Sequence, residues 1–274
     1  MPLRPALSRL AVLLCLGACA TVPVTGRRQL VLIPNSMIHA LSFTQYDSVV
    51  KTSRTLPVTE PRAAMVARVG TGIQGAVERY MAGAGIQKEL AGYQWAYNTI
   101  DENIVNAWCM PGGKVVVYTG LLPITQNERA LAVVMGHEIA HAIARHGSER
   151  MSQALLVGLG GLALDQALKE KSNETRLLFL GLYTVGSKVA LELPHSRMQE
   201  SEADKLGLIF MAMAGYDPTE AVPFWQRMSA ANKGGPSVPG FLSTHPSDEQ
   251  RIRALSALIP EVRAKYYAPA ARGT

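Results

Sequence analysis

The segment 127–146, NERALAVVMGHEIAHAIARH, leaves this chain the fewest structural options. Asn127 is a favourable residue for capping a helix, and the apolar residues after it recur at helical spacing, which predicts one long, largely buried helix. His137 and His141 are four residues apart on that helix, so both imidazoles project from one face, with Glu138 beside them. A chain with this helix must build its core around two histidines and a carboxylate.

The pattern His-x-x-x-His with a glutamate after the first histidine is typical of zinc sites in which the glutamate acts as a general base. The alternative is that His137 and His141 are ordinary core residues at a chance spacing. Burying two imidazoles and a carboxylate without partners costs free energy, which a bound metal offsets. We therefore expect one Zn²⁺ ion per chain, held by His137 and His141, with Glu138 as the catalytic base.

A catalytic zinc site needs a third protein ligand and keeps one position for water, and two histidines with one glutamate are a standard set. The segment 200–204, ESEAD, lies in a helix expected to begin at Ser196. Glu200 fits the third place, and Asp204, one turn later on the same face, can accept the spare ring N–H of a ligand histidine. Acidic residues near a helix start also favour the helix dipole, and Glu202, pointing elsewhere, is expected to do only that.

The N-terminus has the order basic, apolar, small, cysteine that describes a lipoprotein signal. Arg4 and Arg9 precede a short apolar run, and the segment 16–19 reads LGAC. Cleavage before Cys19 and acylation of its thiol would anchor the chain to a membrane, because the apolar run is too short to span one. A plain secretory signal is the alternative. Cys15 would leave with the signal, so Cys109 has no intrachain disulfide partner.

Charge and length set the remaining bounds. The net charge is +6, and the basic residues are scattered without aromatic interleaving, so we expect no nucleic-acid partner. The apolar fraction of 48% is ample for one core. The predicted organisation is a signal peptide at 1–18, a lipidated tether and wrapping segment at 19–58, one main domain at 59–262 and a flexible tail at 263–274.

Periodicity and turn residues predict the elements of that domain. Strands are expected at 93–100, 105–110 and 114–119, the last two joined as a hairpin, with a helix at 61–81 capped by Thr59 and a short strand at 29–33. The apolar, glycine-rich segment 148–193 has a polar break at 169–174, which predicts a helical hairpin. We expect it to pack on the protein, with contact to one membrane leaflet as the alternative. Further helices should begin at Ser196, Asp217 and Ser247, with stops at Gly215 and Pro260.

Five motifs together carry a resemblance to a known family. They are PVTG at 23–26 leading to Gln29-Leu30, the pair Asn106-Ala107 with PGG at 111–113 and GLL at 120–122, HEIAH at 137–141, ESEAD at 200–204, and Thr244-His245-Pro246 with Arg251. The chain resembles zinc metallopeptidases of the gluzincin type, in the superfamily of the CaaX prenyl proteases and HtpX. It is most similar to small lipoprotein peptidases such as LoiP, the peptidase domain of BepA and the mitochondrial inner-membrane stress protease. It departs from the family at Trp108-Cys109-Met110.

The resemblance implies an α+β, mostly helical, zincin-like domain with a small β-sheet and an active-site helix. It implies a zinc-dependent endopeptidase, anchored as a lipoprotein, that degrades misfolded or misassembled envelope proteins. Ala20 after Cys19 favours, by resemblance to other lipoproteins, the periplasm-facing inner leaflet of the outer membrane. Envelope assembly machinery is the further partner it implies.

The substrate would be a protein or peptide in extended conformation, paired with the strand at 114–118 or that at 106–110. In related peptidases the residues matching His245 and Arg251 face the metal. His245 would then fill the open position and keep the enzyme latent, or with Arg251 stabilise the oxyanion. Packing at a helix start is a third reading of His245. The competing function is a non-proteolytic, zinc-containing periplasmic chaperone or assembly factor, and a zinc hydrolase of small molecules is a weaker alternative.

Overall fold

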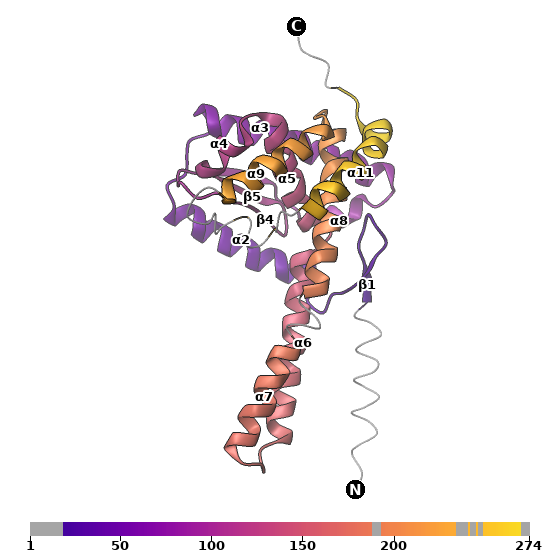
Figure 1. The fold of residues 1–274 in the computed structure, drawn as a ribbon. Coiled ribbons are helices and arrows are strands. Elements are labelled where there is room, and N and C mark those ends of the chain that lie inside the picture. The colour runs from indigo at the N-terminus through magenta and orange to yellow at the C-terminus, as the bar shows by residue number, and fades with distance from the viewer. Residues whose placement is uncertain (1–18, 188–192, 234–240, 242–244, 246–248, 270–274) are drawn as a thin grey trace.

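The computed structural model describes residues 19–187, 193–233, 241, 245 and 249–269, and shows a helical body from which a two-helix hairpin projects (Figure 1). The mostly helical class with small sheets is confirmed. The strands are β1 (Cys19–Thr21), β2 (Arg28–Leu30), β3 (Ala96–Ile100), β4 (Ala107–Met110) and β5 (Lys114–Tyr118). The helices are α2 (Asn35–Thr52), α3 (Pro61–Gly83), α4 (Leu122–Thr125), α5 (Glu128–Ile143), α6 (His146–Ala167), α7 (Asn173–Ser187), α8 (Leu193–Met213), α9 (Ala221–Lys233) and α11 (Glu249–Tyr266), with 3₁₀ turns η1 (Gln87–Leu90), η2 (Thr119–Leu121) and η4 (Pro218–Glu220).

The N-terminal segment is more structured than a tether. β1 and β2 pair as an antiparallel ribbon, and α2 follows. No helix was predicted at 35–52, and this prediction was wrong. Ile38, Ser42 and Tyr46 are buried at a spacing of four, but Met37 and Leu41 are exposed and blur the amphipathic pattern. α2 lies against β5 and covers the sheet. The sequence had predicted only a wrapping segment here.

α3 is the predicted helix, with Val66, Val69 and Ile73 on its buried face. Its cap is Glu60, whose side chain accepts hydrogen bonds from the backbone N–H groups of residues 62 and 63. The predicted cap, Thr59, is wrong because the helix begins at Pro61, and the residue directly before the first turn is the one that reaches its free donors.

The three longer strands form a sheet in the order β3-β5-β4. β4 and β5 pair antiparallel, as predicted, across a turn in which Gly112 and Gly113 have φ of +88° and +86°, a region that favours glycine. β3 runs parallel to β5. β5 is therefore paired on both sides, while β4 lies at an edge of the sheet and beside α5.

α5 and α8 cross at the centre of the body. Asn127 caps α5 as predicted, accepting a 3.0 Å hydrogen bond from the N–H of Ala130. At the crossing, a Cβ atom on Gly207 would lie 2.8 Å from the backbone nitrogen of His137, and one on Gly136 would lie 2.9 Å from the carbonyl oxygen of Gly207. Only two glycines permit this approach, and it brings the histidines of α5 against the carboxylates of α8.

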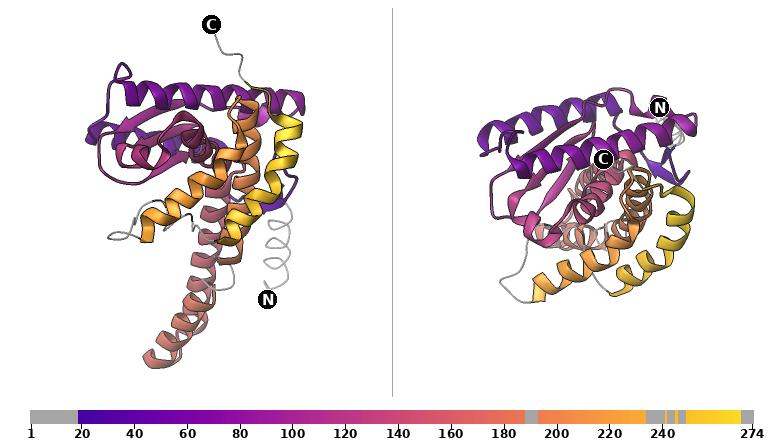
Figure 2. Two further views of the ribbon diagram at one scale, coloured as in Figure 1. Left: turned by 45° about the horizontal axis from the view of Figure 1, so that its top comes forward. Right: turned by 90° about the horizontal axis from the view of Figure 1, so that it is seen from above.

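The C-terminal helices complete the core around α8. Figure 2 shows α8, α9 and α11 gathered on one side of the body, with α2 and α3 on the other. The expected stop at Pro260 is wrong, because α11 continues through it to Tyr266 and so extends beyond the predicted domain end at 262. The helix start predicted at Asp217 is confirmed, since its carboxylate accepts from the N–H of Thr219. The start predicted at Ser247 lies outside the described residues.

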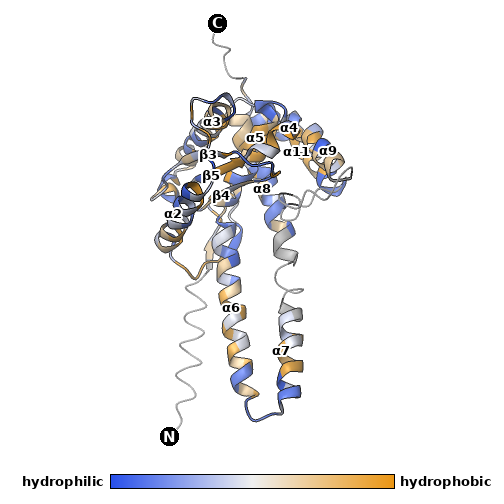
Figure 3. Ribbon diagram, turned by 90° about the vertical axis from the view of Figure 1, so that its left-hand side faces the viewer, coloured by the Kyte–Doolittle hydropathy of each residue, from blue (hydrophilic) through white to orange (hydrophobic). Residues whose placement is uncertain are grey.

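α6 and α7 form the predicted helical hairpin, with a polar turn and apolar arms (Figure 3). Only the first turns of α6 pack on the body, and the rest of the hairpin does not pack there as expected. Leu155, Leu162 and Leu177 are 44%, 69% and 71% exposed, so the outer surfaces of both arms are apolar and uncovered. The arms meet along an inner seam where Tyr183 donates a hydrogen bond to the carbonyl of Val157. No helix among the described residues is long and apolar enough to cross a membrane.

Candidate metal centre

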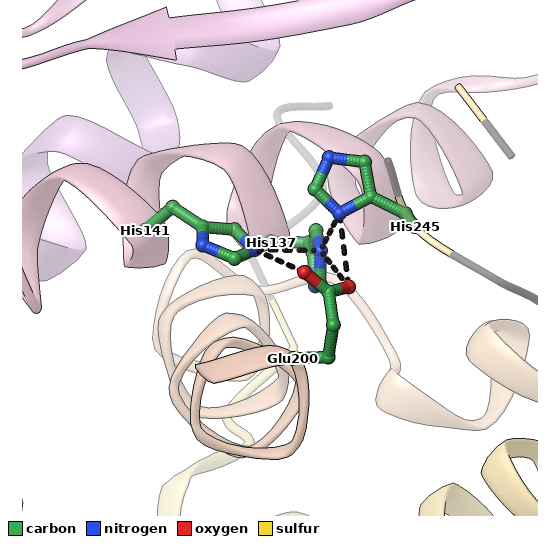
Figure 4. A group of neighbouring side chains, drawn as sticks. All are labelled: His137, His141, Glu200 and His245. Atoms are coloured by element: carbon green, nitrogen blue, oxygen red, sulfur yellow. Dashed lines mark hydrogen bonds and ion pairs between the residues drawn. The ribbon is translucent and has the colours of Figure 1, made fainter. Parts of the chain in front are cut away.

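The three predicted metal ligands meet where α5 faces α8 (Figure 4). The Nε2 atoms of His137 and His141 are 3.1 Å apart. Glu200 reaches both rings, with Oε1 3.2 Å from Nε2 of His141 and Oε2 3.3 Å from Nε2 of His137. Residues on two helices thus present three ligand atoms to one point.

His245 joins them from the segment between α9 and α11. Its Nδ1 lies 2.9 Å from Oε2 of Glu200 and 3.1 Å from Nε2 of His137. Its other nitrogen, Nε2, lies 3.3 Å from Oε1 of Glu138. Its imidazole therefore occupies the fourth corner of the cluster and also contacts the glutamate of the HExxH pattern.

These four side chains fit a zinc ion by chemistry and by spacing. Their ligand atoms all lie within 4.8 Å of one another, and the contacts just given run from 2.9 to 3.3 Å. Four ligands at about 2.0–2.1 Å from a tetrahedral zinc ion would lie roughly 3.3 Å apart. Imidazole and carboxylate are also ligand types that zinc accepts. The donor set is therefore preassembled for this metal.

Electrostatics in the cluster favour a bound cation. Burial acts to raise the pKa of Glu200, but hydrogen bonds with His137, His141 and His245 hold it well below its usual value. Burial lowers the pKa of His141, which leaves that ring neutral. Burial also acts to lower the pKa of His137, but its bonds with Asp204 and Glu200 raise it to about 9. An ionised carboxylate and a neutral imidazole are the forms that bind metal, so Glu200 and His141 are already in these forms. His137, whose pKa is raised, must lose a proton when it binds a metal ion.

Glu138 is suited to move protons. It is almost fully buried, and burial raises its pKa, although His245 and His137 act to lower it. Its Oε1 atom has no hydrogen-bond partner among the described residues. That oxygen lies 3.3 Å from Nε2 of His245. A buried carboxylate with a raised pKa next to a metal centre has the properties of a general base.

Asp204 and Arg251 lie directly behind His137. Oδ1 of Asp204 is 3.0 Å from Nδ1 of His137, the partner expected from the sequence. Arg251 grips that carboxylate with two hydrogen bonds of 2.7 and 2.8 Å and lies over the ring of Trp225, 3.7 Å from its centroid. The guanidinium is thus directed mainly at Asp204, although one of its nitrogens is 3.4 Å from Glu200.

A second polar cluster, which was not predicted from the sequence, lies behind His141. His146 lies 2.8 Å from that ring, and Glu202 links His146 to Arg27 and Thr25 of the N-terminal ribbon. The expectation that Glu202 merely favours a helix dipole is wrong, because α8 begins at Leu193 and Glu202 lies well inside it. Two features of the sequence could have indicated this cluster: the histidine five residues after His141, and the PVTG motif at 23–26, to which no role was assigned.

Comparison with known proteins identifies a family and several relatives of this chain. The family model described as Peptidase family M48 matches residues 69–259. The mitochondrial metalloendopeptidase OMA1 of Schizosaccharomyces pombe is 32% identical over 250 residues, which are 89% of this chain and 67% of the relative. OMA1 of Bos taurus is 33% identical over 87% of this chain and 46% of the relative. The beta-barrel assembly-enhancing protease of Yersinia pestis is 28% identical over 56% of this chain and 32% of the relative. The chain thus spans from about a third to two thirds of these proteins.

Proposed function

This chain belongs to peptidase family M48, a family of zinc metallopeptidases, and from this premise we propose that it is an endopeptidase that cuts protein chains at the cluster of His137, His141 and Glu200. One observation carries the proposal. The cluster combines a preassembled donor set with Glu138, a buried carboxylate directly after the first histidine ligand. Metal ligands and a base of this kind are what hydrolysis of a peptide bond requires.

Each side chain has a definite task in this scheme. A zinc ion bound here would supply a Lewis acid that polarises the peptide carbonyl and makes water more acidic. Glu138 takes the proton from the attacking water and later gives it to the leaving amine. Asp204, gripped by Arg251, keeps His137 in one tautomer, with Nε2 directed at the ligand cluster.

His245 is assigned to latency. Its Nδ1 atom lies among the ligand atoms, where it competes with water for the open position of a catalytic site. Of the two roles that the sequence left open near the metal, the geometry supports this one. Arg251 is assigned to the support of Asp204 rather than to the oxyanion, because its two short hydrogen bonds go to that carboxylate.

The proposed substrate is an extended protein segment that adds to the edge of β4. β4 lies at the edge of its sheet and contacts α5, so a strand paired with it would lie near the metal ligands. The other strand considered, 114–118, is excluded because β5 is paired with β3 on one side and β4 on the other. Bound in this way, a misfolded chain is a better substrate than a folded one, since its backbone is free to pair.

The proposed location is a bacterial envelope membrane, through a lipid on Cys19. In the ribbon, Cys19 pairs with Leu30, and the N–H of Leu32 donates to the hydroxyl of Ser152 at the base of α6. The lipidated end would therefore lie beside the base of the apolar hairpin. In this arrangement the lipid and the hairpin could contact the same membrane. The Yersinia pestis relative is named for beta-barrel assembly, which supports an assembly machinery as a partner. Misassembled envelope proteins are the substrates that we propose with it.

The position of His245 also supports a second function, that of a chaperone or assembly factor. Structural zinc sites are closed by four protein ligands, and His245 closes this one. A protein with a permanently closed site would hold its clients without cutting them, as a chaperone or assembly factor does.

Cleavage of casein by the purified protein distinguishes the two functions. We expect the wild type to cut casein, and Glu138→Gln to retain zinc and fold but lose at least a hundredfold in rate, because the variant lacks the base. Glu128→Gln, on the same helix and exposed, is the matched control. A Glu138→Gln protein that cuts like the wild type contradicts the mechanism, and a wild type that only suppresses aggregation supports the chaperone.

A further inference from the structure

Both metal-facing histidines of α5 use their second ring nitrogen, but in different ways. Nδ1 of His137 faces Asp204. Nδ1 of His141 instead faces another imidazole, with Nδ1 of His146 only 2.8 Å away. His146 is fully buried and lies at the start of α6, where Arg145 adopts a φ of +60° and turns the chain out of α5. That turn lets residues five apart meet ring to ring.

The contacts continue from His146 to the N-terminal ribbon. Nε2 of His146 is 3.0 Å from Oε2 of Glu202, and the same oxygen accepts a 2.8 Å hydrogen bond from Nε of Arg27. The hydroxyl of Thr25 donates to the other oxygen of Glu202. The terminal nitrogens of Arg27 bind both oxygens of Glu149, at 2.9 and 2.7 Å. Four elements are thus joined in one connected set of hydrogen bonds.

The donor and acceptor roles in this set follow from the carboxylate. An ionised carboxylate only accepts hydrogen bonds, so His146 must donate to Glu202 through Nε2–H. In a neutral imidazole the other nitrogen then carries a lone pair, so Nδ1 of His146 accepts from Nδ1–H of His141. The proton on Nδ1 leaves the lone pair of His141 on Nε2, which is the nitrogen directed at Glu200 and His137.

We propose that His146, Glu202 and Arg27 are positioning residues that fix the tautomer and the orientation of His141, so that the affinity of the centre for zinc depends on the N-terminal ribbon. The inference rests on the proposed metal site and deepens it. Of the three, His146 contacts the ligand His141 directly, and Glu202 and Arg27 act through His146. The ribbon, which begins at the predicted lipidation site Cys19, thereby supports the metal centre.

Zinc affinity of the full chain, measured by competition with a chromophoric chelator, tests this dependence. His146→Leu removes both polar contacts at similar size, and we expect its affinity to fall about 10- to 100-fold, the range found when such supporting partners are lost. His146→Asn offers an amide oxygen to His141 and should recover part of the loss. Arg27→Ala should lose less than His146→Leu, and Arg28→Ala, the exposed neighbour, should match the wild type.

Equal affinity of the wild type and a folded His146→Leu protein would overturn the proposal. Because zinc affinity is measured without substrate, a protein that binds zinc but never cuts contradicts the proposed function alone. Long-range ¹⁵N–¹H spectra of the imidazoles in the zinc-loaded wild type give a second test that needs no variant. We expect protons on Nδ1 of His141 and Nε2 of His146, and a proton on Nδ1 of His146 would overturn the assignment.

Discussion

At the residue scale, we propose that His245 decides whether the centre is open or closed. Its Nδ1 atom lies among the ligand atoms, and its Nε2 is 3.3 Å from Oε1 of Glu138. In the proposed latent state this one side chain hinders both the water position and the base. Removing it should help the reaction. Removing a group that stabilises the oxyanion should do the opposite.

His245→Ala should therefore raise basal casein cleavage about tenfold, the factor that corresponds to a lost competing interaction of about 1.4 kcal/mol. The increase should disappear in the double variant with Glu138→Gln, which shows that the same site does the cutting. A fall of roughly a hundredfold would instead assign His245 to the oxyanion.

The sequence revealed the site residues unevenly, for a physical reason. His137, Glu138 and His141 share one turn of helix, so their spacing alone places them together. Glu200 could be predicted as the third ligand because two histidines and one glutamate are a standard ligand set for zinc. The link from His141 through His146 to Arg27 joins residues up to 175 positions apart, because Arg27 contacts Glu202, and no local pattern encodes such a contact.

At the scale of elements, the crossing of α5 and α8 sets the geometry of the centre. Periodicity and turn residues predicted α5, the helical hairpin and the pairing of β4 with β5, because each depends on neighbours in sequence. It did not predict that β3 would pair with β5, nor that Gly136 and Gly207 would meet, since both depend on how distant elements pack.

Gly207→Ala should destabilise the protein by about 1–3 kcal/mol in urea unfolding, the usual cost of overpacking. The added methyl group would lie 2.8 Å from the backbone nitrogen of His137, which cannot rotate away as a side chain can. To make room for the methyl group, α5 and α8 must move apart. This movement should also weaken zinc binding, because it separates His137 from Asp204.

Gly181→Ala, in the exposed arm α7, is the control. Its methyl group meets nothing within 4 Å, so helix propensity should leave the protein as stable as before, or up to about 1 kcal/mol more stable. Equal stability of the two variants would show that the helices can separate at no cost.

At the scale of the whole molecule, the predicted tether is part of the body. The ribbon binds α6 and α8 through Arg27, and α2 covers the sheet. A domain boundary at residue 59 would therefore separate residues that are in contact. The ribbon also holds the proposed lipid anchor and the base of the hairpin on one side of the protein.

Cys19→Ser should move the protein from the membrane fraction to the soluble fraction, because the mature chain loses its acyl chains. Cys109→Ser, which changes a half-buried free thiol, should fractionate like the wild type. If Cys19→Ser stays with membranes, the exposed leucines of α6 and α7 hold it there instead.

The zinc content of the purified protein tests the central claim most directly, because the proposed function depends on the ligand set His137, His141 and Glu200. Metal analysis should find about one zinc ion per wild-type chain and far less in Glu200→Gln, whose neutral amide is a poor ligand. Glu261→Gln, on the exposed face of α11, should keep its zinc. Equal zinc content in wild type and Glu200→Gln would contradict the account.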